Sequence, residues 1–242
     1  MINVIFVIPS YIKTQNSENI TNHKKLKLFH SNVLTTNTRY KKLIDQLNRE
    51  EPDVVILQEV NNSWIKNLTS IKTIYHHFIE LPRSDNFGIA LYSKIPISEY
   101  KIHRWTDYDL PSIEAKLVLD GVPFHIIATH PLPPVNKQYY DARNLQIKAV
   151  SDIVRKLDTA KIVIGDLNTS IWSVDYKVLE SDTGLFNVSK GFGIIPTWPT
   201  NLIPMMIPID HCLVSKHFNV VGVKSGENFG SDHLSLIVEL KL

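Results

Sequence analysis

Apolar side chains recur every three to four residues in several parts of this chain, which is the pattern of amphipathic helices. The two longest stretches predict helices over about 38–50 and 138–157, and Pro52 ends the first of them. Two shorter helices are expected over 62–68 and 172–180. Each of these helices has one apolar face, so each must pack against another layer of the fold.

Unbroken apolar runs alternate with these helices. The runs at 54–57 and 161–164 predict strands covered on both faces. Strand patterns dominate from 72 to 130, where Asp120-Gly121 is a hairpin turn, and again towards the C-terminus. The other expected strands are 26–29, 87–92, 113–119, 122–129, 208–214, 218–224 and 234–241. This order predicts two packed sheets with helices outside them, an α+β layered sandwich.

Short polar motifs stand at the ends of these apolar runs. Asn, Asp, Glu and His are poor strand formers, so such residues at strand ends are candidates for function. Six motifs of this kind, rich in carboxylate and imidazole, predict one metal-assisted site at one edge of a sheet. The motifs are Ser31-Asn32-Val33, Gln58-Glu59-Val60, Thr129-His130-Pro131, Gly165-Asp166-Leu167-Asn168, Ile209-Asp210-His211 and Ser231-Asp232-His233.

Each motif alone has an ordinary structural explanation. Glu59 after a buried strand is costly unless it is paired or binds a cation, but a surface salt bridge would also satisfy it. Asp166 and Asn168 alternate along an extended segment and can point to one side, or they form a turn that ends the strand. Asp210 and Asn32 fit turns equally well. The combination is therefore more specific than any of its parts.

Composition narrows the class of protein only slightly. The chain has 242 residues, 43% of them apolar, which is enough for one large domain with a substantial core. A net charge of +2 neither establishes nor excludes nucleic-acid binding. The single cysteine, Cys212, excludes disulfides within the chain and cysteine-based zinc sites. Its apolar neighbours indicate a buried side chain rather than a catalytic thiol.

The N-terminal segment 2–12 is apolar, but it contains Pro9 and is too short to span a bilayer. This segment could be an edge strand or the end of an upstream membrane segment, and the sequence does not decide between the two. We expect residues 1–25 to form an N-terminal arm or the remnant of an upstream segment, and residues 26–242 to form one catalytic domain.

In their order and spacing the motifs resemble the endonuclease/exonuclease/phosphatase superfamily, which has the DNase I-like fold. The resemblance runs from about Leu26 to the C-terminus and is strongest to bacterial members similar to YafD. It implies a four-layer α/β/β/α sandwich that hydrolyses phosphate esters with Mg²⁺ or Mn²⁺. The segments that carry it are 52–60, 128–134, 197–199 and 208–211.

The resemblance implies a metal site built from oxygen atoms. Glu59 matches the main metal ligand, Asn32 lies nearby, and Asp232 is a further ligand. Mg²⁺ prefers hard oxygen ligands and needs only one or two protein carboxylates beside the substrate phosphate, which agrees with this set.

The resemblance also implies the catalytic residues. Asp166 and Asn168 match the pair that positions or activates the attacking water and binds the phosphate. His233 matches the histidine that contacts the scissile phosphate or acts as base, and Asp210 matches the carboxylate that orients this histidine. His130 matches a second histidine, a hydrogen-bond donor to the phosphate or a general acid to the leaving oxygen.

Two positions depart from the family pattern. The family commonly ends its last motif as Ser-Asp-His-Arg-Pro, whereas Leu234 and Ser235 follow the Asp-His pair here. The local loop shape and any contact of the missing arginine are therefore open. Leu34 stands where several nuclease members carry an acidic ligand, which favours a sparser metal shell with one tightly held ion.

Four other residues are weaker candidates for substrate binding. They lie at helix starts or in a Thr-Trp-Pro segment, where plain surface exposure and core packing are the alternatives. These candidates are Arg39, Arg143, Asn144 and Trp198. His211 should point away from Asp210 on the same strand, so it is left out of the site.

Together these implications favour a Mg²⁺-dependent phosphodiesterase that uses in-line attack of water, with nucleic acid as the first choice of substrate. A lipid phosphodiesterase similar to sphingomyelinases, or a phosphomonoesterase, remains an alternative on the same fold, and the apolar segment 204–208 leaves the lipid option open. A non-catalytic module that binds phosphate or nucleic acid is a second alternative. We expect a monomer, with an envelope or secreted location favoured over the cytoplasm because relatives carry membrane anchors.

Overall fold

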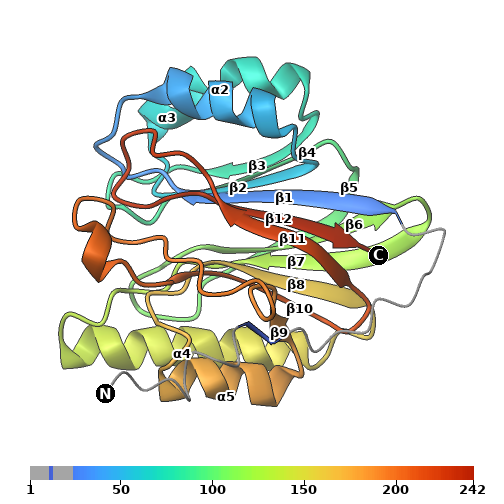
Figure 1. The fold of residues 1–242 in the computed structure, drawn as a ribbon, viewed down its shortest axis with the longest axis vertical. Coiled ribbons are helices and arrows are strands. Elements are labelled where there is room, and N and C mark those ends of the chain that lie inside the picture. The colour runs from blue at the N-terminus through green and yellow to red at the C-terminus, as the bar shows by residue number, and fades with distance from the viewer. Residues whose placement is uncertain (1–10, 13–23) are drawn as a thin grey trace.

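The computed structural model describes residues 11–12 and 24–242, and these form two six-stranded sheets stacked face to face (Figure 1). The strand order is β11-β12-β1-β2-β4-β3 in the first sheet and β5-β6-β7-β8-β10-β9 in the second. Helices cover the outer face of each sheet, so the layers run helix, sheet, sheet, helix. The expected α+β sandwich of four layers is confirmed.

The elements have the following bounds. The first sheet contains β1 (Lys25–Asn32), β2 (Val54–Gln58), β3 (His77–Leu81), β4 (Ile89–Ser93), β11 (Asn219–Ser225) and β12 (Leu236–Lys241). The second contains β5 (Ile97–His103), β6 (Ser112–Leu119), β7 (Val122–Ala128), β8 (Ala160–Asp166), β9 (Phe186–Asn187) and β10 (Asp210–Val214). The helices are α2 (Tyr40–Glu50), α3 (Asn62–Asn67), α4 (Lys137–Val154) and α5 (Val174–Thr183), with the 3₁₀ turns η2 (Thr69–Thr73) and η3 (Ile203–Met205).

Three apolar clusters hold the four layers together. The largest lies between the sheets and includes Leu28 and Ile164. A second, with Leu43 and Trp64, joins the first sheet to α2 and α3. A third, with Val150, joins the second sheet to α4 and α5. Since burial of apolar area is the main favourable term in folding, these clusters hold the two sheets and their covering helices against one another.

The sequence placed most elements correctly and missed some boundaries. Helix α5 runs over 174–183 rather than 172–180, because the Ser173 side chain caps its first turn and Gly184 ends it in a left-handed conformation. The predicted helix 138–157 ends earlier, with α4. Strands β3 and β5 were not predicted individually, because their side chains are largely exposed and form no apolar run.

The topology brings the polar strand ends to one edge of the molecule. Strands β1 and β2 are parallel, as are β7 and β8, so within each pair the carboxyl ends lie side by side. Strand β10 runs antiparallel to β8, with Asp210 opposite Asp166. The ends of these strands lie at the left edge of Figure 1.

Most of the expected N-terminal arm lies outside the described residues, so the division at residue 25 stays a prediction. Among the residues that the structure describes, none of the helices has the length and apolar character needed to span a membrane.

Candidate active site

The polar strand ends surround a cleft with a volume of about 730 Å³. The first sheet contributes Glu59, which follows β2, and the second contributes His130 and Asp166 from the ends of β7 and β8. Asp232 and His233 enter from the turn before β12. Side chains more than 170 positions apart in sequence (Glu59 and His233) therefore line one cavity, as the sequence motifs predicted.

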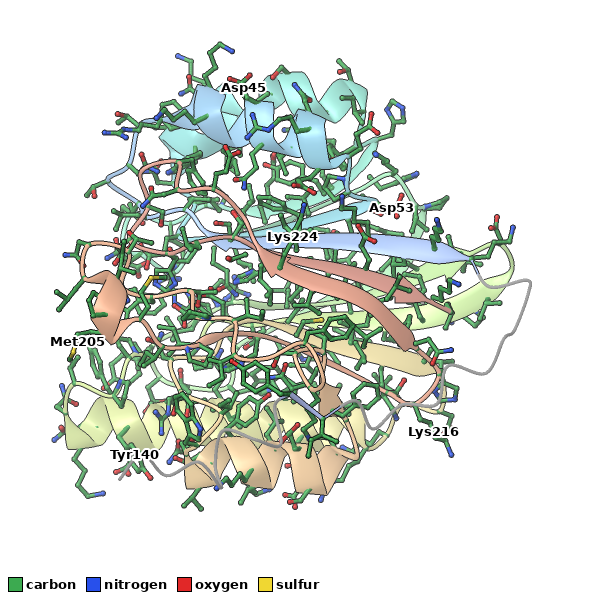
Figure 2. All side chains as sticks on the ribbon, viewed as in Figure 1. Asp45, Asp53, Tyr140, Met205, Lys216 and Lys224 are labelled. Atoms are coloured by element: carbon green, nitrogen blue, oxygen red, sulfur yellow. The ribbon has the colours of Figure 1, made fainter. Side chains whose placement is uncertain are left out.

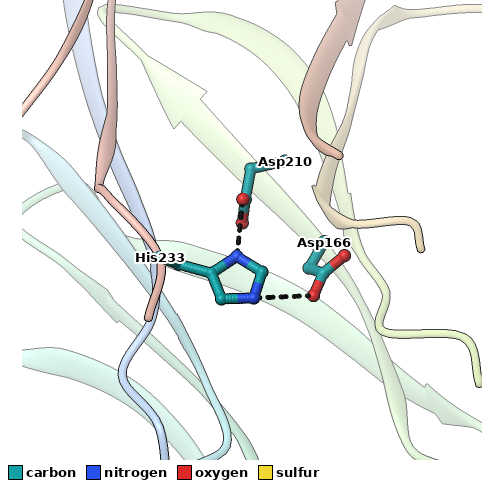
Figure 3. A group of neighbouring side chains, drawn as sticks. All are labelled: Asp166, Asp210 and His233. Atoms are coloured by element: carbon teal, nitrogen blue, oxygen red, sulfur yellow. Dashed lines mark hydrogen bonds and ion pairs between the residues drawn. The ribbon is translucent and has the colours of Figure 1, made fainter. Parts of the chain in front are cut away.

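At the centre of the site, buried carboxylates and imidazoles contact one another, and Figure 3 shows His233 between Asp210 and Asp166. Asp210 Oδ2 lies 2.8 Å from His233 Nδ1, and His233 Nε2 lies 3.6 Å from Asp166 Oδ2. His130 Nε2 approaches the same Asp166 oxygen at 3.5 Å. Two imidazoles thus converge on Asp166 from different loops, and the carboxylate of Asp210 orients one of them.

His30, which the sequence motifs missed, lies on the far side of Asp210. Its Nε2 donates to Asp210 Oδ1 at 2.8 Å, and both side chains are fully buried. Asp210 therefore accepts one imidazole on each oxygen, from His30 and His233. A signal was present in the sequence, because alternation along the strand from Leu28 places His30 and Asn32 on the face that packs against the other sheet.

Burial and the charges of neighbouring groups set the protonation states of Asp166, Asp210 and His233. Burial alone would lower the pKa of His233, but the charges of Asp210 and Asp166 outweigh it and raise the pKa to about 10. Burial would raise the pKa of Asp210, but His233 and His30 hold it well below its usual range. The pKa of Asp166 is likewise lowered, against burial, by His130 and His233. At neutral pH the arrangement holds ionised carboxylates against an imidazolium.

Gln58 connects the two sheets beneath the site. Its side-chain NH₂ donates to the Thr129 carbonyl at 2.8 Å, and its side-chain oxygen accepts from the Asp166 backbone N–H at 2.8 Å. Gly165 allows this contact, because a Cβ there would lie 2.0 Å from the Thr129 oxygen and 2.6 Å from Gln58 Nε2. One glutamine of the first sheet therefore fixes the backbone beside both His130 and Asp166.

Oxygen ligands face the open side of the cleft. The Glu59 carboxylate accepts from Asn32 Nδ2 at 2.9 Å and from the Thr35 backbone N–H at 3.2 Å, and the residue has a left-handed φ of 62°. Asp232 accepts from the Trp198 indole at 3.2 Å. Glu59 and Asp232 both line the cleft and are only half-buried, so these hard oxygen donors fit Mg²⁺ or Mn²⁺.

Two further arrangements bear on the metal ligands. Asn32 donates to Glu59 and uses its own oxygen to accept from the Leu34 N–H, so it orients Glu59 here, and its role as a ligand stays a prediction. Ligand atoms of Asp166, Asp210 and His233 lie within 4.8 Å of one another. Asp210 is buried with an imidazole on each oxygen, whereas Glu59 and Asp232 are half-buried and line the cleft, so their role as the metal ligands stays the prediction.

Arg143 and the Pro131 carbonyl hold Asn168 in place. Its backbone is left-handed, with φ of 49°, and its side chain donates to the Pro131 carbonyl at 2.9 Å. The buried Arg143 donates to the Asn168 carbonyl at 3.0 Å and to Asp175 at 2.8 Å. Asn144 accepts two further bonds from the same guanidinium. Arg143 lines the cleft and its guanidinium holds the Asn168 loop, and the predicted contact of Arg143 and Asn144 with substrate stays a prediction.

Of the two remaining candidates, one lines the cleft and the other does not. Trp198 lines the cleft and its ring lies 6.3 Å from that of His233. Arg39 is exposed and is not among the lining residues. His211 is buried away from the site and bonds to the Thr169 carbonyl at 2.7 Å, which agrees with its exclusion from the site.

Solved structures similar to this one share its fold at low sequence identity. D. rerio TDP2 complexed with a single-strand DNA product matches with a TM-score of 0.74 and 18% identity, covering 90% of this chain and 100% of that one. The endonuclease/exonuclease/phosphatase from Beutenbergia cavernae matches with 0.75 and 18%, covering 90% and 72%. The human Nocturnin catalytic domain with bound sulfate matches with 0.71 and 21%, covering 90% and 97%.

Sequence comparison gives the family. No curated protein matches this chain in sequence. The closer likeness to YafD stays a prediction. The model of the Endonuclease/Exonuclease/phosphatase family matches residues 22–233, nearly the whole described chain. With this match and the DNase I-like arrangement of its sheets, the chain belongs to the Endonuclease/Exonuclease/phosphatase family.

Proposed function

We propose that this chain is a divalent-metal-dependent phosphodiesterase that uses Mg²⁺ or Mn²⁺. The observation that carries the proposal is the convergence of His130 and His233 on Asp166, at 3.5 and 3.6 Å, in the cleft that Glu59 also lines. A hydrolase of phosphate esters needs a site for the attacking water, donors for the phosphoryl oxygens and a donor for the leaving oxygen. These residues can supply all three.

The residues divide the reaction between them. Glu59 and Asp232 would hold the ion, which neutralises charge that develops on the phosphoryl oxygens when it is bound. Asp166, whose lowered pKa keeps it ionised, orients the water and accepts its proton as the new P–O bond forms. His233, whose raised pKa keeps it protonated, donates to a phosphoryl oxygen. His130 donates a proton to the leaving oxygen as the old P–O bond breaks.

Nucleic acid and lipid remain the two substrate classes to compare. The TDP2 neighbour holds a single-strand DNA product, which supports nucleic acid as the first choice. Phe87 and Trp198 line the cleft and offer ring faces to a base. The cleft also has apolar walls from Pro133, Ile207 and Ile209, which suit an acyl chain or another apolar group.

The test compares three variants with one exposed control. Glu59→Ala, Asp166→Ala and His233→Ala should each reduce hydrolysis of a phosphodiester by orders of magnitude. Asp158→Ala, exposed and at the opposite end of β8 from Asp166, should not. The substrates are single-stranded DNA, duplex DNA, RNA, sphingomyelin and inositol phosphates, each with Mg²⁺ and with Mn²⁺. Turnover by Asp166→Ala at the rate of the unmodified protein would refute the assigned role. Metal binding without any turnover would instead support the non-catalytic alternative.

A further inference from the structure

His30 is a buried polar side chain that the proposed mechanism does not use. It lies on β1 and is fully buried. Figure 2 shows side chains filling the space between the two sheets, and the apolar Leu26 and Leu28 share this face of β1 with His30. A polar ring in such a layer is costly unless it is hydrogen-bonded, so the contacts of His30 indicate what it does there.

His30 forms a contact between the sheets. Its Nε2 donates to Oδ1 of Asp210, which is the first residue of β10 in the second sheet, at 2.8 Å. Asp210 Oδ2 lies 2.8 Å from His233 Nδ1. His233 precedes β12, and β12 pairs with β1 so that Leu236 lies opposite His30. Two imidazoles attached to the first sheet therefore hold one carboxylate of the second sheet from both sides.

The hydrogen bond from His30 fixes the plane of the Asp210 carboxylate. The Asp210 backbone is already held, because it pairs with Asp166 across β10 and β8. Rotation of the carboxylate about its bond to Cβ has no narrow preferred angle, so hydrogen bonds must set it. With Oδ1 bound to His30, Oδ2 stays directed at His233.

The ring of His30 is arranged to donate to Asp210. An ionised carboxylate only accepts hydrogen bonds, so the proton between the two groups lies on Nε2. Among the described residues, none hydrogen-bonds to His30 Nδ1, which is buried. A proton on Nδ1 would be a buried donor without an acceptor, which is costly. The contacts therefore favour a neutral His30 with its proton on Nε2.

The other carboxylate of the second sheet is held in a similar way. Gln58, on the neighbouring strand β2, accepts from the Asp166 backbone N–H at 2.8 Å. Each of the two carboxylates is thus fixed by one polar side chain of the first sheet, Gln58 or His30. Catalytic groups need partners of this kind to keep them in a productive geometry.

We propose that His30 is a positioning residue, which fixes the Asp210 carboxylate so that His233 is held in the orientation that the reaction needs. The inference rests on the proposed phosphodiesterase function, in which His233 meets the phosphate. His30 is not among the residues that line the cleft, so it acts through Asp210 and not on the substrate. Loss of the contact should therefore change kcat far more than KM.

Steady-state hydrolysis of bis-p-nitrophenyl phosphate with Mg²⁺ tests the proposal. His30→Leu removes the donor and should lower kcat about 10- to 100-fold, as expected for a lost hydrogen bond to a charged group, with KM within about twofold. His30→Gln keeps an amide donor near the position of Nε2 and should bring kcat to within about fivefold of the unmodified protein. Leu28→Val changes packing on the same face of β1 without removing a hydrogen-bonding group, and should leave kcat unchanged.

Nitrogen NMR of the histidine rings, in EDTA, gives a second measurement that needs no turnover. The chemical shift of each ring nitrogen shows whether it carries a proton. His30→Gln and His233→Gln each remove one ring and so assign its signals. His30 should carry its proton on Nε2 only, and the Nδ1–H of His233 should exchange with water faster in His30→Leu than in the unmodified protein.

Other results overturn the proposal. Equal kcat of His30→Leu and the unmodified protein refutes the positioning role, as does a His30→Gln variant that is as slow as His30→Leu. A proton on His30 Nδ1, or unchanged exchange at His233 in His30→Leu, refutes it without an assay. If His30→Leu does not fold, His30→Asn takes its place, because its shorter side chain stays polar but withdraws the donor from Asp210.

A failure of the proposed function is recognised separately. If the unmodified protein hydrolyses no phosphodiester, that function is wrong, while the NMR measurement still decides whether His30 orients His233 through Asp210.

Discussion

The two sheets bring different kinds of side chain to the shared cleft. The second sheet contributes Asp166 and Asp210, which are 2% and 3% exposed and bound to imidazoles. The first sheet contributes Glu59, which is half-buried and turns its carboxylate towards the cleft. The buried carboxylates are paired with imidazoles, whereas the Glu59 carboxylate has only an amide and a backbone N–H as partners and faces the cleft. We therefore expect the buried carboxylates of the second sheet to set the geometry of the reaction together with His233, which precedes β12, and Glu59 to recruit the ion.

The largest effect should follow from Asp210→Asn on the buried side. The amide removes the charge between His30 and His233, so His233 loses the partner that orients it and stabilises its protonated form. We expect kcat to fall by about 10³- to 10⁴-fold, as when the carboxylate of a His-Asp pair is replaced. Steady-state hydrolysis of a soluble phosphodiester measures this, with Asp158→Asn as the exposed control. A fall of less than about tenfold would remove Asp210 from the mechanism.

Glu59→Gln tests the open side and should behave differently. The variant keeps the size of the side chain but weakens its affinity for a cation, so the metal concentration for half-maximal activity should rise by about 10- to 100-fold. Excess Mg²⁺ should restore part of the activity of Glu59→Gln and none of the activity of Asp210→Asn. Hydrolysis measured against Mg²⁺ concentration for both variants tests this difference. Equal rescue of the two would contradict the division between the sheets.

The ionisation of the buried side should make stability depend on pH. The raised pKa of His233, about 10 against an ordinary 6.5, stabilises the folded state fully below pH 6.5, and the contribution is lost as pH rises towards 10. The lowered pKa values of Asp166 and Asp210, against an ordinary 3.8, also stabilise the folded state. This contribution is present above pH 3.8 and is lost as the pH falls below that value. Metal-free protein should therefore be most stable between these limits.

Urea unfolding in EDTA at about pH 5, 7 and 9 measures this dependence. The unmodified protein should lose unfolding free energy between the middle and the highest pH. His233→Gln should show a much smaller loss, because it removes the group that titrates. An equal alkaline loss in both proteins would place its origin elsewhere in the chain.

Much of this organisation could be predicted from the sequence, because strand ends and helix stripes are local signals. The apolar runs before Glu59 and Asp166 correctly predicted strands β2 and β8, at whose ends these two residues lie. What the sequence did not give are contacts that exist only when the sheets are stacked. His30 looked like part of a strand until β10 placed Asp210 against it. Arg143 looked like an exposed helix residue until the loop after β8 placed the Asn168 carbonyl beside it.

Gly165→Ala tests the contact between the sheets with a single methyl group. The new Cβ would meet the Thr129 carbonyl oxygen and Gln58 Nε2 well inside contact distance, so the backbone at Asp166 must move. We expect a loss of about 1–3 kcal/mol in the free energy of unfolding, and lower kcat. Gly222→Ala is the matched control, because the nearest atom to its Cβ is 3.8 Å away. Urea unfolding of both variants, with assays of both, checks the expectation.

Arg143→Lys should have the smallest effect and isolates the position of Asn168. Lysine keeps the charge for Asp175 but cannot also reach the Asn168 carbonyl and Asn144 in the fork geometry of arginine. The left-handed backbone of Asn168 then loses one of its anchors, and we expect kcat to fall about tenfold with KM nearly unchanged. A rise in KM with constant kcat would instead show that Arg143 contacts substrate, as its position at a helix start had first suggested. Because the two outcomes move different constants, steady-state kinetics on one soluble phosphodiester separates a positioning residue from a binding residue.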